Sequence, residues 1–598
     1  MNAERVFAAR AFIAGTVALY VLGLGVLAAR LKRVQLDDAA IYSYNQSRQA
    51  ERRVQTDGVR GRILDRSGRI LATNRRARMI VLNAECFQRR TWSATAQEMR
   101  AAITRAEEIL GLKSIVTEKA ISRHLNQRLA RPLIVWRDVE EETLARFCEH
   151  ARELAGFECE ESDERTYPYG TLAAHLIGYV GRGRGEGQAG DSPFNFYDPE
   201  MRGRSGLEYS YDDYLRGMSG EERVLVDARG FATKRWTVVA AKCGPDLVTT
   251  IDAELQSVAE QVLTGVRGAC VVLDPVSGDV LALASAPGYD LNGFVPYLPR
   301  TTYETLSKDE EKPLLNRASG GVYAPGSTFK PIVALAALEK GYDPETIYEC
   351  VGHFDLNGLR IRCARTWGHG ELDMPGALRE SCNPYFCDLG MVLGSNTVIS
   401  AARQFGLGHA TGIDFGVDSA GVVPDDEWKR GRYSEKWFPG DLAQMSIGQG
   451  MLLVTPLQMA CVAGALGTGE LVTPHLVLGR TSARRRLPYA ASAFEIVREG
   501  MRQVVTRGAG KPVAKDLEAW VIGKTGTAEV GSRASRRKNA WFIAYAESGA
   551  RDEAGHLVRM RAPARRVALA LVVEQGDSGG TTAAPRVNEV LRQVFHVH

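Results

Sequence analysis

The pattern of apolar and polar positions divides the 598-residue chain into three parts. Residues 11–29 carry no charge and are almost wholly apolar, about the length of a helix that crosses a bilayer. Segments with alternating and amphipathic patterns follow to about residue 240. From residue 245 to the end, apolar runs are typical of buried strands and helices. Since 598 residues are too many for one hydrophobic core, we expect two or three domains.

The apolar N-terminal segment predicts a retained transmembrane anchor. A cleaved signal peptide would have a shorter apolar core and a small-residue cleavage site, whereas Arg30, Lys32 and Arg33 follow this segment at once. A simple count of basic residues would place residues 1–10 outside and the bulk of the chain in the cytoplasm, because fewer basic residues precede the segment than follow it. Large domains translocate largely regardless of such charges. We therefore expect residues 1–10 in the cytoplasm and the bulk of the chain in the periplasm.

Alternating and amphipathic patterns predict the N-terminal half to be a mixed domain. Residues from about Leu31 to Gln55 read as a polar helical stalk, and Arg60–Ala72 reads as strand, turn and strand. Trp92–Cys159 reads mostly as amphipathic helices, and Gly183–Pro193 as a loose loop.

Strand patterns at both ends of the C-terminal half predict an antiparallel sheet with helices on both faces. Leu247–Asp252 begins this half, and Glu254–Val266 reads as its first helix. The runs that read as strands are Ala269–Leu273, Val280–Ser285, Val521–Ala528, Ala540–Ala544 and Val567–Val573. The fold class is therefore α+β in several domains.

Composition excludes some classes of function. The net charge of +4 is small for this length and argues against a nucleic-acid partner. Ordinary apolar content argues against disorder. Ten cysteines are present, and Cys350, Cys363, Cys382 and Cys387 fall in one short region.

The stretch Tyr323–Pro331 carries the first candidate chemistry. Pro325 and Gly326 break the preceding structure, and an apolar helical run follows. Ser327 and Lys330 are three residues apart, so they share one helical face. A buried lysine tends to lose its proton, which would make Lys330 a base and Ser327 a nucleophile. Alone, the pattern also fits an ordinary serine cap.

Two further motifs complete a set. Ser381-Cys382-Asn383 lies downstream, and Lys524-Thr525-Gly526-Thr527 lies near the C-terminus. Each is weak alone, but the three in this order resemble the motif set of penicillin-binding proteins and class A β-lactamases. The chain thus resembles a penicilloyl-serine transferase with a transpeptidase domain.

The N-terminal half resembles the non-catalytic pedestal, or dimerisation domain, of class B penicillin-binding proteins. Arg60–Ala72, Arg165–Gly170, Ala174–Gly181 and Gly203–Gly217 carry this resemblance. His175 lies there, and we expect it to be structural. The domains expected are 1–10 cytoplasmic tail, 11–29 anchor, 30–240 pedestal and 245–598 transpeptidase domain.

The resemblance implies a role for each motif residue. Ser327 would attack the carbonyl between the two terminal D-alanines of a stem peptide, with Lys330 as base. Ser381 would relay the proton to the leaving amine, Asn383 would hold a substrate amide, and Lys524 would supply a fixed positive charge. Thr525 and Thr527 would bind a substrate carboxylate, and Gly526 would leave room for the substrate. The amides of Ser327 and Thr527 would form the oxyanion hole.

The stretches Trp367–Leu372, Trp437–Asp441 and Ile447–Gly450 resemble the elongation-type enzymes of this class. They imply a peptidoglycan D,D-transpeptidase that β-lactams inhibit and that works beside a SEDS-family glycosyltransferase and other elongation-complex membrane proteins. The alternatives are a division-type enzyme, a β-lactam sensor or slow β-lactamase, and a scaffold with a dead site.

The crowded cysteines predict one structural zinc ion bound by Cys350, Cys363, His369 and Cys382. Three thiolates and one imidazole suit tetrahedral zinc, although the spacings are wider than in zinc fingers. Elongation-type enzymes that resemble this chain carry metal ligands at matching spacings. His353 and Cys387 are reserve ligands, and a disulfide or free buried thiols are the alternatives.

Overall fold

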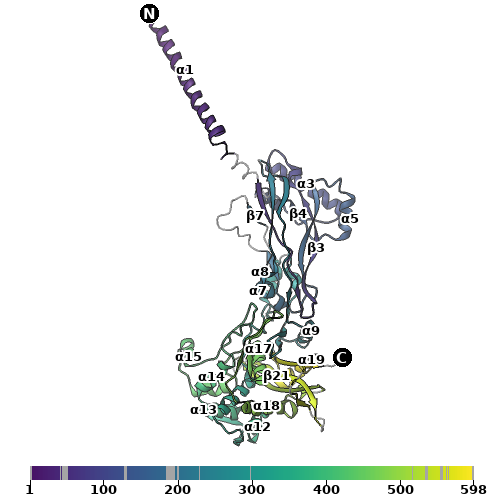
Figure 1. Ribbon diagram of the computed structural model, residues 1–598, viewed down its shortest axis with the longest axis vertical. Coiled ribbons are helices and arrows are strands. Elements are labelled where there is room, and N and C mark those ends of the chain that lie inside the picture. Colours follow the sequence, from purple (N-terminus) through teal and green to yellow (C-terminus); the bar gives the residue numbers. More distant parts are fainter. Residues whose placement is uncertain are drawn as a thin grey trace.

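The computed structural model describes the chain apart from residues 1–2, 41, 43–50, 127–130, 183–194, 198–200, 228, 296–297, 515, 532–536, 553–556, 561, 563 and 596–598. An N-terminal helix leads to an elongated region of strands and helices, and a larger domain at the far end contains the C-terminus (Figure 1). The loop expected at Gly183–Pro193 lies wholly outside the described residues.

Helix α1 (Ala3–Lys32) covers the apolar N-terminal segment, and a π-helical turn extends it over Arg33–Asp37. It is the single helix in the described part of the chain that is long and apolar enough to cross a membrane. The prediction of a helical stalk to Gln55 is wrong at its end, because β1 (Glu51–Thr56) is a strand. Val54 of β1 is buried against Val224 and Val226, so tertiary pairing overrides the local helical pattern.

Two sheets form the pedestal, here residues 51–248. The first has the order β10-β9-β1-β7, with β7 (Asn195–Tyr197), β9 (Gly220–Val226) and β10 (Ala232–Val239). The second has the order β11-β2-β3-β4, and β5 also pairs with β3. Its strands are β2 (Ile63–Leu64), β3 (Ile70–Leu82), β4 (Leu133–Trp136), β5 (Phe157–Thr166) and β11 (Leu247–Val248). β2, a turn and β3 match the predicted hairpin.

Helices share a hydrophobic core with the second sheet, and short elements lie toward the C-terminal domain. The helices of that core are α3 (Trp92–Leu110), α4 (Glu118–Asn126) and α5 (Glu141–Glu149). The short elements are α6 (Ala174–Ile177), β6 (Val180–Arg182), β8 (Met201–Gly203), α7 (Gly206–Ser210) and α8 (Asp212–Leu215). Trp92–Cys159 is therefore mostly helical, as predicted.

A buried ion cluster joins the pedestal elements near the C-terminal domain. Glu208 lies fully buried between the guanidinium groups of Arg60 and Arg165, each 2.6 Å away. Breaking such a buried pair would leave an uncompensated charge. Leu247–Val248, expected to open the second domain, instead pairs in parallel with Ile63–Leu64. The boundary segment therefore belongs to the pedestal sheet.

The C-terminal domain is built around one antiparallel sheet of order β13-β12-β23-β21-β20, as predicted. Its strands are β12 (Gly268–Leu273), β13 (Val280–Ala286), β20 (Ala519–Val530), β21 (Arg537–Arg551) and β23 (Arg566–Val573), with β22 (Leu557–Arg559) paired to β21. The central strands are continuous apolar runs because both faces of the sheet are buried.

Separate hydrophobic clusters cover the two faces. One contains α17 (Pro456–Thr468), and the other contains α9 (Ala253–Gln261) and α19 (Ala584–Phe595). The other helices are α10 (Arg300–Lys308), α11 (Lys330–Glu339), α12 (Met374–Glu380), α13 (Asn383–Leu393), α14 (Ser395–Gln404), α15 (Asp426–Tyr433), α16 (Pro439–Ser446) and α18 (Ala491–Thr506). Short two-stranded pairs are β14 (Tyr348–Cys350) with β17 (Gly370–Leu372), β15 (His353–Leu356) with β16 (Leu359–Arg362), and β18 (Glu470–Val472) with β19 (Arg484–Arg486).

Candidate active site

Ser327 lies in a tight turn that precedes a buried helix. Gly326–Phe329 forms one turn of 3-10 helix, and α11 continues from Lys330. Gly326 has φ of +57°, and a Cβ there would lie 2.8 Å from the carbonyl oxygen of Thr527. Glycine is therefore required both for the backbone conformation and for the close approach of β20. The turn places Ser327 directly beside the Lys-Thr-Gly-Thr strand.

Lys330 is fully buried, and its ammonium position is fixed by three acceptors. Its Nζ lies 2.7 Å from the carbonyl oxygen of Ser381, 2.7 Å from Asn383 Oδ1 and 3.4 Å from Ser381 Oγ. Burial lowers the pKa of Lys330 to about 8. Among the described residues no hydrogen bond joins Lys330 to Ser327. The role of Lys330 as the base for Ser327 stays a prediction.

The second motif joins two helices. Ser381 caps the C-terminus of α12 with φ of +57°, which is uncommon for a residue other than glycine. Asn383 begins α13, and its Nδ2 donates to the carbonyl oxygen of Arg362 at 3.0 Å. Because Asn383 also accepts from Lys330, both ends of its amide are held. The turn thus places the Ser381 hydroxyl and the Asn383 amide beside Lys330 Nζ.

Lys524 contacts the hydroxyl of the same serine. Its Nζ lies 2.9 Å from Ser381 Oγ and 3.2 Å from the carbonyl oxygen of Thr525, and the side chain is fully buried. Burial and then the charge of Lys330 lower the pKa of Lys524 well below its usual value. The fixed positive charge that the resemblance implies for Lys524 stays a prediction.

Gly526 also has a packing role that the sequence did not predict. A Cβ at this position would lie 2.8 Å from Thr328 Cγ2 and 2.9 Å from the carbonyl oxygen of Pro325. Glycine therefore lets the serine turn pack closely against β20, and the role of leaving room for a substrate stays a prediction. Thr525 is mostly buried, whereas Thr527 is partly exposed beside Ser327.

Several supporting residues were not predicted. Glu574, just after β23, accepts from Tyr323 Oη at 2.9 Å and from Arg317 Nε at 2.8 Å. Trp541 Nε1 donates to the carbonyl oxygen of Ala324 at 3.0 Å. These contacts hold the residues just before Ser327 against β21 and the end of β23. Tyr323 lies inside the first motif, whereas Glu574 and Trp541 lie 251 and 217 positions from the residues that they contact there, so no local pattern indicates them.

The four predicted metal ligands come together. The ligand atoms of Cys350, Cys363, His369 and Cys382 all lie within 4.8 Å of one another. His369 Nδ1 is 3.3 Å from Cys363 Sγ and 3.6 Å from Cys350 Sγ, and the Sγ atoms of Cys363 and Cys382 are 4.0 Å apart. The contact with Cys382 lowers the pKa of Cys363.

The reserve ligands lie outside this cluster. His353 pairs with Asp355 at 3.2 Å, and Cys387 contacts the carbonyl oxygen of Ala443 at 3.4 Å. All ten cysteines are free, and a separation of 4.0 Å between Cys363 and Cys382 is about twice a disulfide bond length of about 2.05 Å.

Two other features lie apart from the motifs. His175 Nε2 contacts the carbonyl oxygen of Pro313 at 2.6 Å, and burial lowers the pKa of this histidine to about 4. It is a buried structural residue, as predicted.

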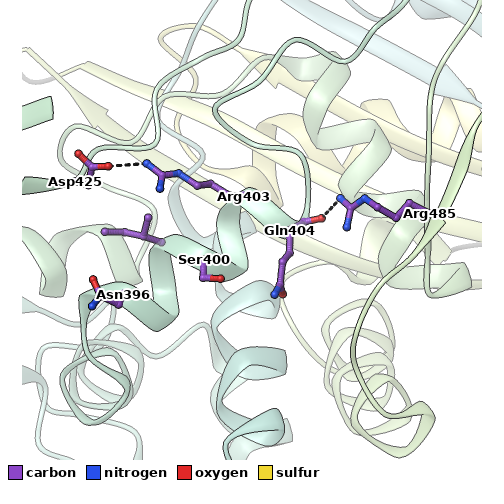
Figure 2. A pocket seen from close by; sticks show the side chains of 7 residues that line it. Asn396, Ser400, Arg403, Gln404, Asp425 and Arg485 are labelled. Carbon is purple, nitrogen blue, oxygen red and sulfur yellow. Dashed lines mark hydrogen bonds and ion pairs between the residues drawn. The ribbon is translucent and has the colours of Figure 1, made fainter. Parts of the chain in front are cut away.

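A cavity of about 460 Å³ beside α14 contains the Arg403–Asp425 ion pair and Arg485 (Figure 2). Its lining residues include none of the three motifs.

Comparison with known proteins identifies both halves of the chain. The penicillin-binding protein dimerisation domain family matches residues 55–249, and the penicillin binding protein transpeptidase domain family matches residues 268–592. A peptidoglycan D,D-transpeptidase, MrdA, of Acinetobacter baumannii is 32% identical over 97% of this chain and 86% of that protein. The Escherichia coli MrdA is 31% identical over 96% of this chain and 91% of that protein.

Solved structures of related proteins have a similar fold over nearly the whole length of this chain. Penicillin-binding protein 2 of Helicobacter pylori in complex with MreC has a TM-score of 0.75 and 25% identity, covering 91% of this chain and 99% of that one. A peptidoglycan synthase complex described as coordinating polymerization and crosslinking contains a chain with a TM-score of 0.70 and 28% identity, covering 98% of each chain. The chain therefore belongs to the elongation-type class B penicillin-binding proteins, which are peptidoglycan D,D-transpeptidases.

Proposed function

We propose that Ser327, Lys330, Ser381, Asn383 and Lys524 divide the acyl transfer among them. Ser327 Oγ attacks the D-alanyl carbonyl and gives its proton to the neutral amine of Lys330. The terminal D-alanine leaves with a proton relayed through Ser381, and an ester to Ser327 remains. The amine of a second stem peptide then attacks this ester and restores the serine. Asn383 holds a backbone amide of the substrate.

The observation that carries this assignment is the position of Ser381 Oγ between two buried lysines, 3.4 Å from Lys330 Nζ and 2.9 Å from Lys524 Nζ. Burial lowers the pKa of both amines, which suits a proton relay. The backbone amides of Ser327 and Thr527 form the oxyanion hole, and each donor contributes on the order of 3 kcal/mol. The hydroxyls of Thr525 and Thr527 bind the substrate carboxylate.

Labelling with fluorescent penicillin tests the nucleophile. Ser327→Ala should lose covalent labelling while its melting temperature stays within a few degrees of wild type, because only one partly exposed hydroxyl is removed. Ser482→Ala, in a loop that contains none of the three motifs, is the matched control and should label normally. A labelled Ser327→Ala protein would assign the nucleophile elsewhere.

We further propose that the four ligands Cys350, Cys363, His369 and Cys382 bind one structural zinc ion. A tetrahedral zinc ion with bonds of about 2.3 Å to sulfur and about 2.0 Å to nitrogen separates its sulfurs by about 3.8 Å and sulfur from nitrogen by about 3.5 Å. The distances of 4.0, 3.3 and 3.6 Å between these atoms support that geometry. The ion would stabilise the loop that carries Ser381 and Asn383, because Cys382 lies between them.

Elemental analysis of purified protein tests the zinc proposal. We expect about one zinc per chain, and about none in a Cys363→Ser, His369→Ala double variant. A Cys387→Ser variant is the matched control, because Cys387 lies outside the cluster. Wild-type protein that contains no metal and an oxidised Cys363–Cys382 pair would favour the disulfide.

We also propose that α1 anchors the protein in the inner membrane with the catalytic domain in the periplasm, beside a SEDS-family glycosyltransferase. The relatives solved with MreC and within a peptidoglycan synthase complex support such an assembly. Replacing residues 1–33 with an unrelated anchor should weaken co-purification with the polymerase. Unchanged recovery would restrict the contact to the pedestal or refute it.

A further inference from the structure

The stretch Ile447–Gly450 follows α16, and its side chains take no part in the acyl transfer proposed above. Its backbone closes the helix with a Schellman motif. The N–H of Gly448 donates to the carbonyl oxygen of Met445 at 2.8 Å, and the N–H of Gln449 donates to that of Gln444 at 2.9 Å. Gly448 has φ of +72°, the left-handed conformation that this motif needs. The end of the helix therefore fixes the backbone of Gln449.

The same segment is joined to the turn Gly326–Phe329, which contains the nucleophile. Gly326 donates its N–H to the carbonyl oxygen of Gly448 at 2.8 Å. Further along, Tyr323 and Val454 exchange both of their backbone hydrogen bonds, at 2.9 and 2.8 Å. Two points of contact thus hold the segment against the residues just before the nucleophile.

The side chain of Gln449 joins the segment to β20 as well. It is half-buried, and its Nε2 donates to the carbonyl oxygen of Thr527 at 3.1 Å. β20 is the edge strand of its sheet, and Thr527 lies opposite Ala540 of β21. In an antiparallel pair a residue points its N–H and its carbonyl to the same side. Because the carbonyl of Thr527 faces Gln449, its N–H also faces away from β21.

Two consecutive residues therefore contact both halves of the proposed oxyanion hole. Gly448 binds the N–H of the residue before Ser327, and Gln449 binds the carbonyl of Thr527. An oxyanion hole is effective when its donors already point at the place where the negative charge develops. An edge strand has a neighbouring strand on one side alone, so the hydrogen bond from Gln449 limits its twist on the open side.

We propose that Gln449 is a positioning residue that aims the N–H of Thr527 at the oxyanion. This inference rests on the proposed function, which assigns that N–H and the N–H of Ser327 to the oxyanion hole. Gln449 acts through Thr527 and does not touch the substrate. Its removal should therefore slow the chemical step and leave the first binding of a β-lactam unchanged.

Two variants remove the donor and keep the shape of the side chain. Gln449→Met is neutral and of similar length, and Gln449→Glu has the same heavy-atom skeleton but cannot donate when it is ionised. Stopped-flow labelling of the full-length chain in detergent with fluorescent penicillin gives the dissociation constant of the first complex and the acylation rate constant at saturation. Titration of labelled sites normalises each rate to the folded, reactive protein.

A boronic acid provides a second measurement without turnover. Its boron forms a tetrahedral adduct with the serine oxygen, and one of its oxygens then lies where the oxyanion would lie. The Kd of this adduct therefore reports on the oxyanion hole, whereas the Kd of the first penicillin complex does not. A variant that had only lost stability would bind both probes normally in its folded fraction.

We expect Gln449→Met to lower the acylation rate constant about tenfold to a hundredfold, because loss of a whole oxyanion donor costs about a hundred- to a thousandfold. The Kd of the boronic acid should rise by a similar factor, and the Kd of the first penicillin complex should stay within about twofold. Gln449→Glu should lose at least as much, since its charge also opposes the oxyanion. Gln444→Met, which replaces a half-buried glutamine of α16, is the matched control and should behave as wild type.

A Gln449→Met protein with the wild-type acylation rate constant and boronic acid Kd would overturn the inference, because packing alone would then aim the donor. A change confined to the first penicillin complex would overturn it too, since Gln449 would then contact the ligand. Faster acylation would show that Gln449 blocks a carbonyl that the substrate needs. Covalent labelling of Ser327→Ala would instead refute the proposed function, so the two failures are distinguishable.

Discussion

The pH dependence of acylation tests the assignment of Lys330 as the base. A base must be neutral to accept the proton of Ser327, and burial lowers the pKa of Lys330 to about 8. The sign follows directly: acylation should rise with pH as Lys330 loses its proton, and should level off above its pKa. A lysine at its usual pKa of 10.5 would give no plateau below pH 10.

The size of the effect follows from the same value. With a pKa of about 8, the neutral fraction of Lys330 is about 3% at pH 6.5, about 24% at pH 7.5 and about 91% at pH 9. Acylation should therefore increase about eightfold from pH 6.5 to 7.5 and only about fourfold from pH 7.5 to 9. An unshifted lysine would give about tenfold per pH unit throughout this range.

The assay is the second-order rate constant of acylation by fluorescent penicillin, measured by stopped flow from pH 6 to 10. Lys330→Met keeps a similar shape without a base, so its rate should fall about a hundred- to ten-thousand-fold and its pH dependence should disappear. A wild-type profile that rises tenfold per unit through pH 9.5 would refute the lowered pKa. A Lys330→Met protein with the wild-type profile would refute the role of Lys330.

Three further outcomes follow from the structure. Chelation should lower the melting temperature and the acylation rate together, with added zinc restoring both; a chelated protein with full rate and stability would count against a structural ion. Gly526→Ala should cost about 1–3 kcal/mol and slow acylation at least tenfold, because its Cβ would press on the Pro325 carbonyl oxygen; thermal melting and labelling measure both, and a wild-type result would show that the turn can shift freely. Glu574→Gln should slow acylation with little change in penicillin affinity, since it weakens contacts to Tyr323 and Arg317 before the serine; an unchanged acylation rate constant would leave Glu574 without a positioning role.

The sequence alone determined the elements whose signals are local. The apolar run at residues 11–29 became α1, and four apolar runs became strands of the antiparallel sheet within two residues of their predicted ends. The fifth, Ala540–Ala544, is the middle of a longer strand, β21, which continues to Arg551. Strands buried on both faces read as continuous apolar runs, which is why they were recognisable. The three motifs were also visible, because their residue types and order are unusual together.

Only the tertiary structure decided how distant residues act on one another. It brings Lys524 to Ser381 across 143 positions, and burial together with the charge of Lys330 lowers the pKa of Lys524. It pairs Glu574 with Tyr323 across 251 positions. It also makes residues 51–56 a strand, because pairing with β9 outweighs their local helical pattern. The charge state of a buried group and the partner of a strand depend on long-range packing, which no short stretch of sequence contains.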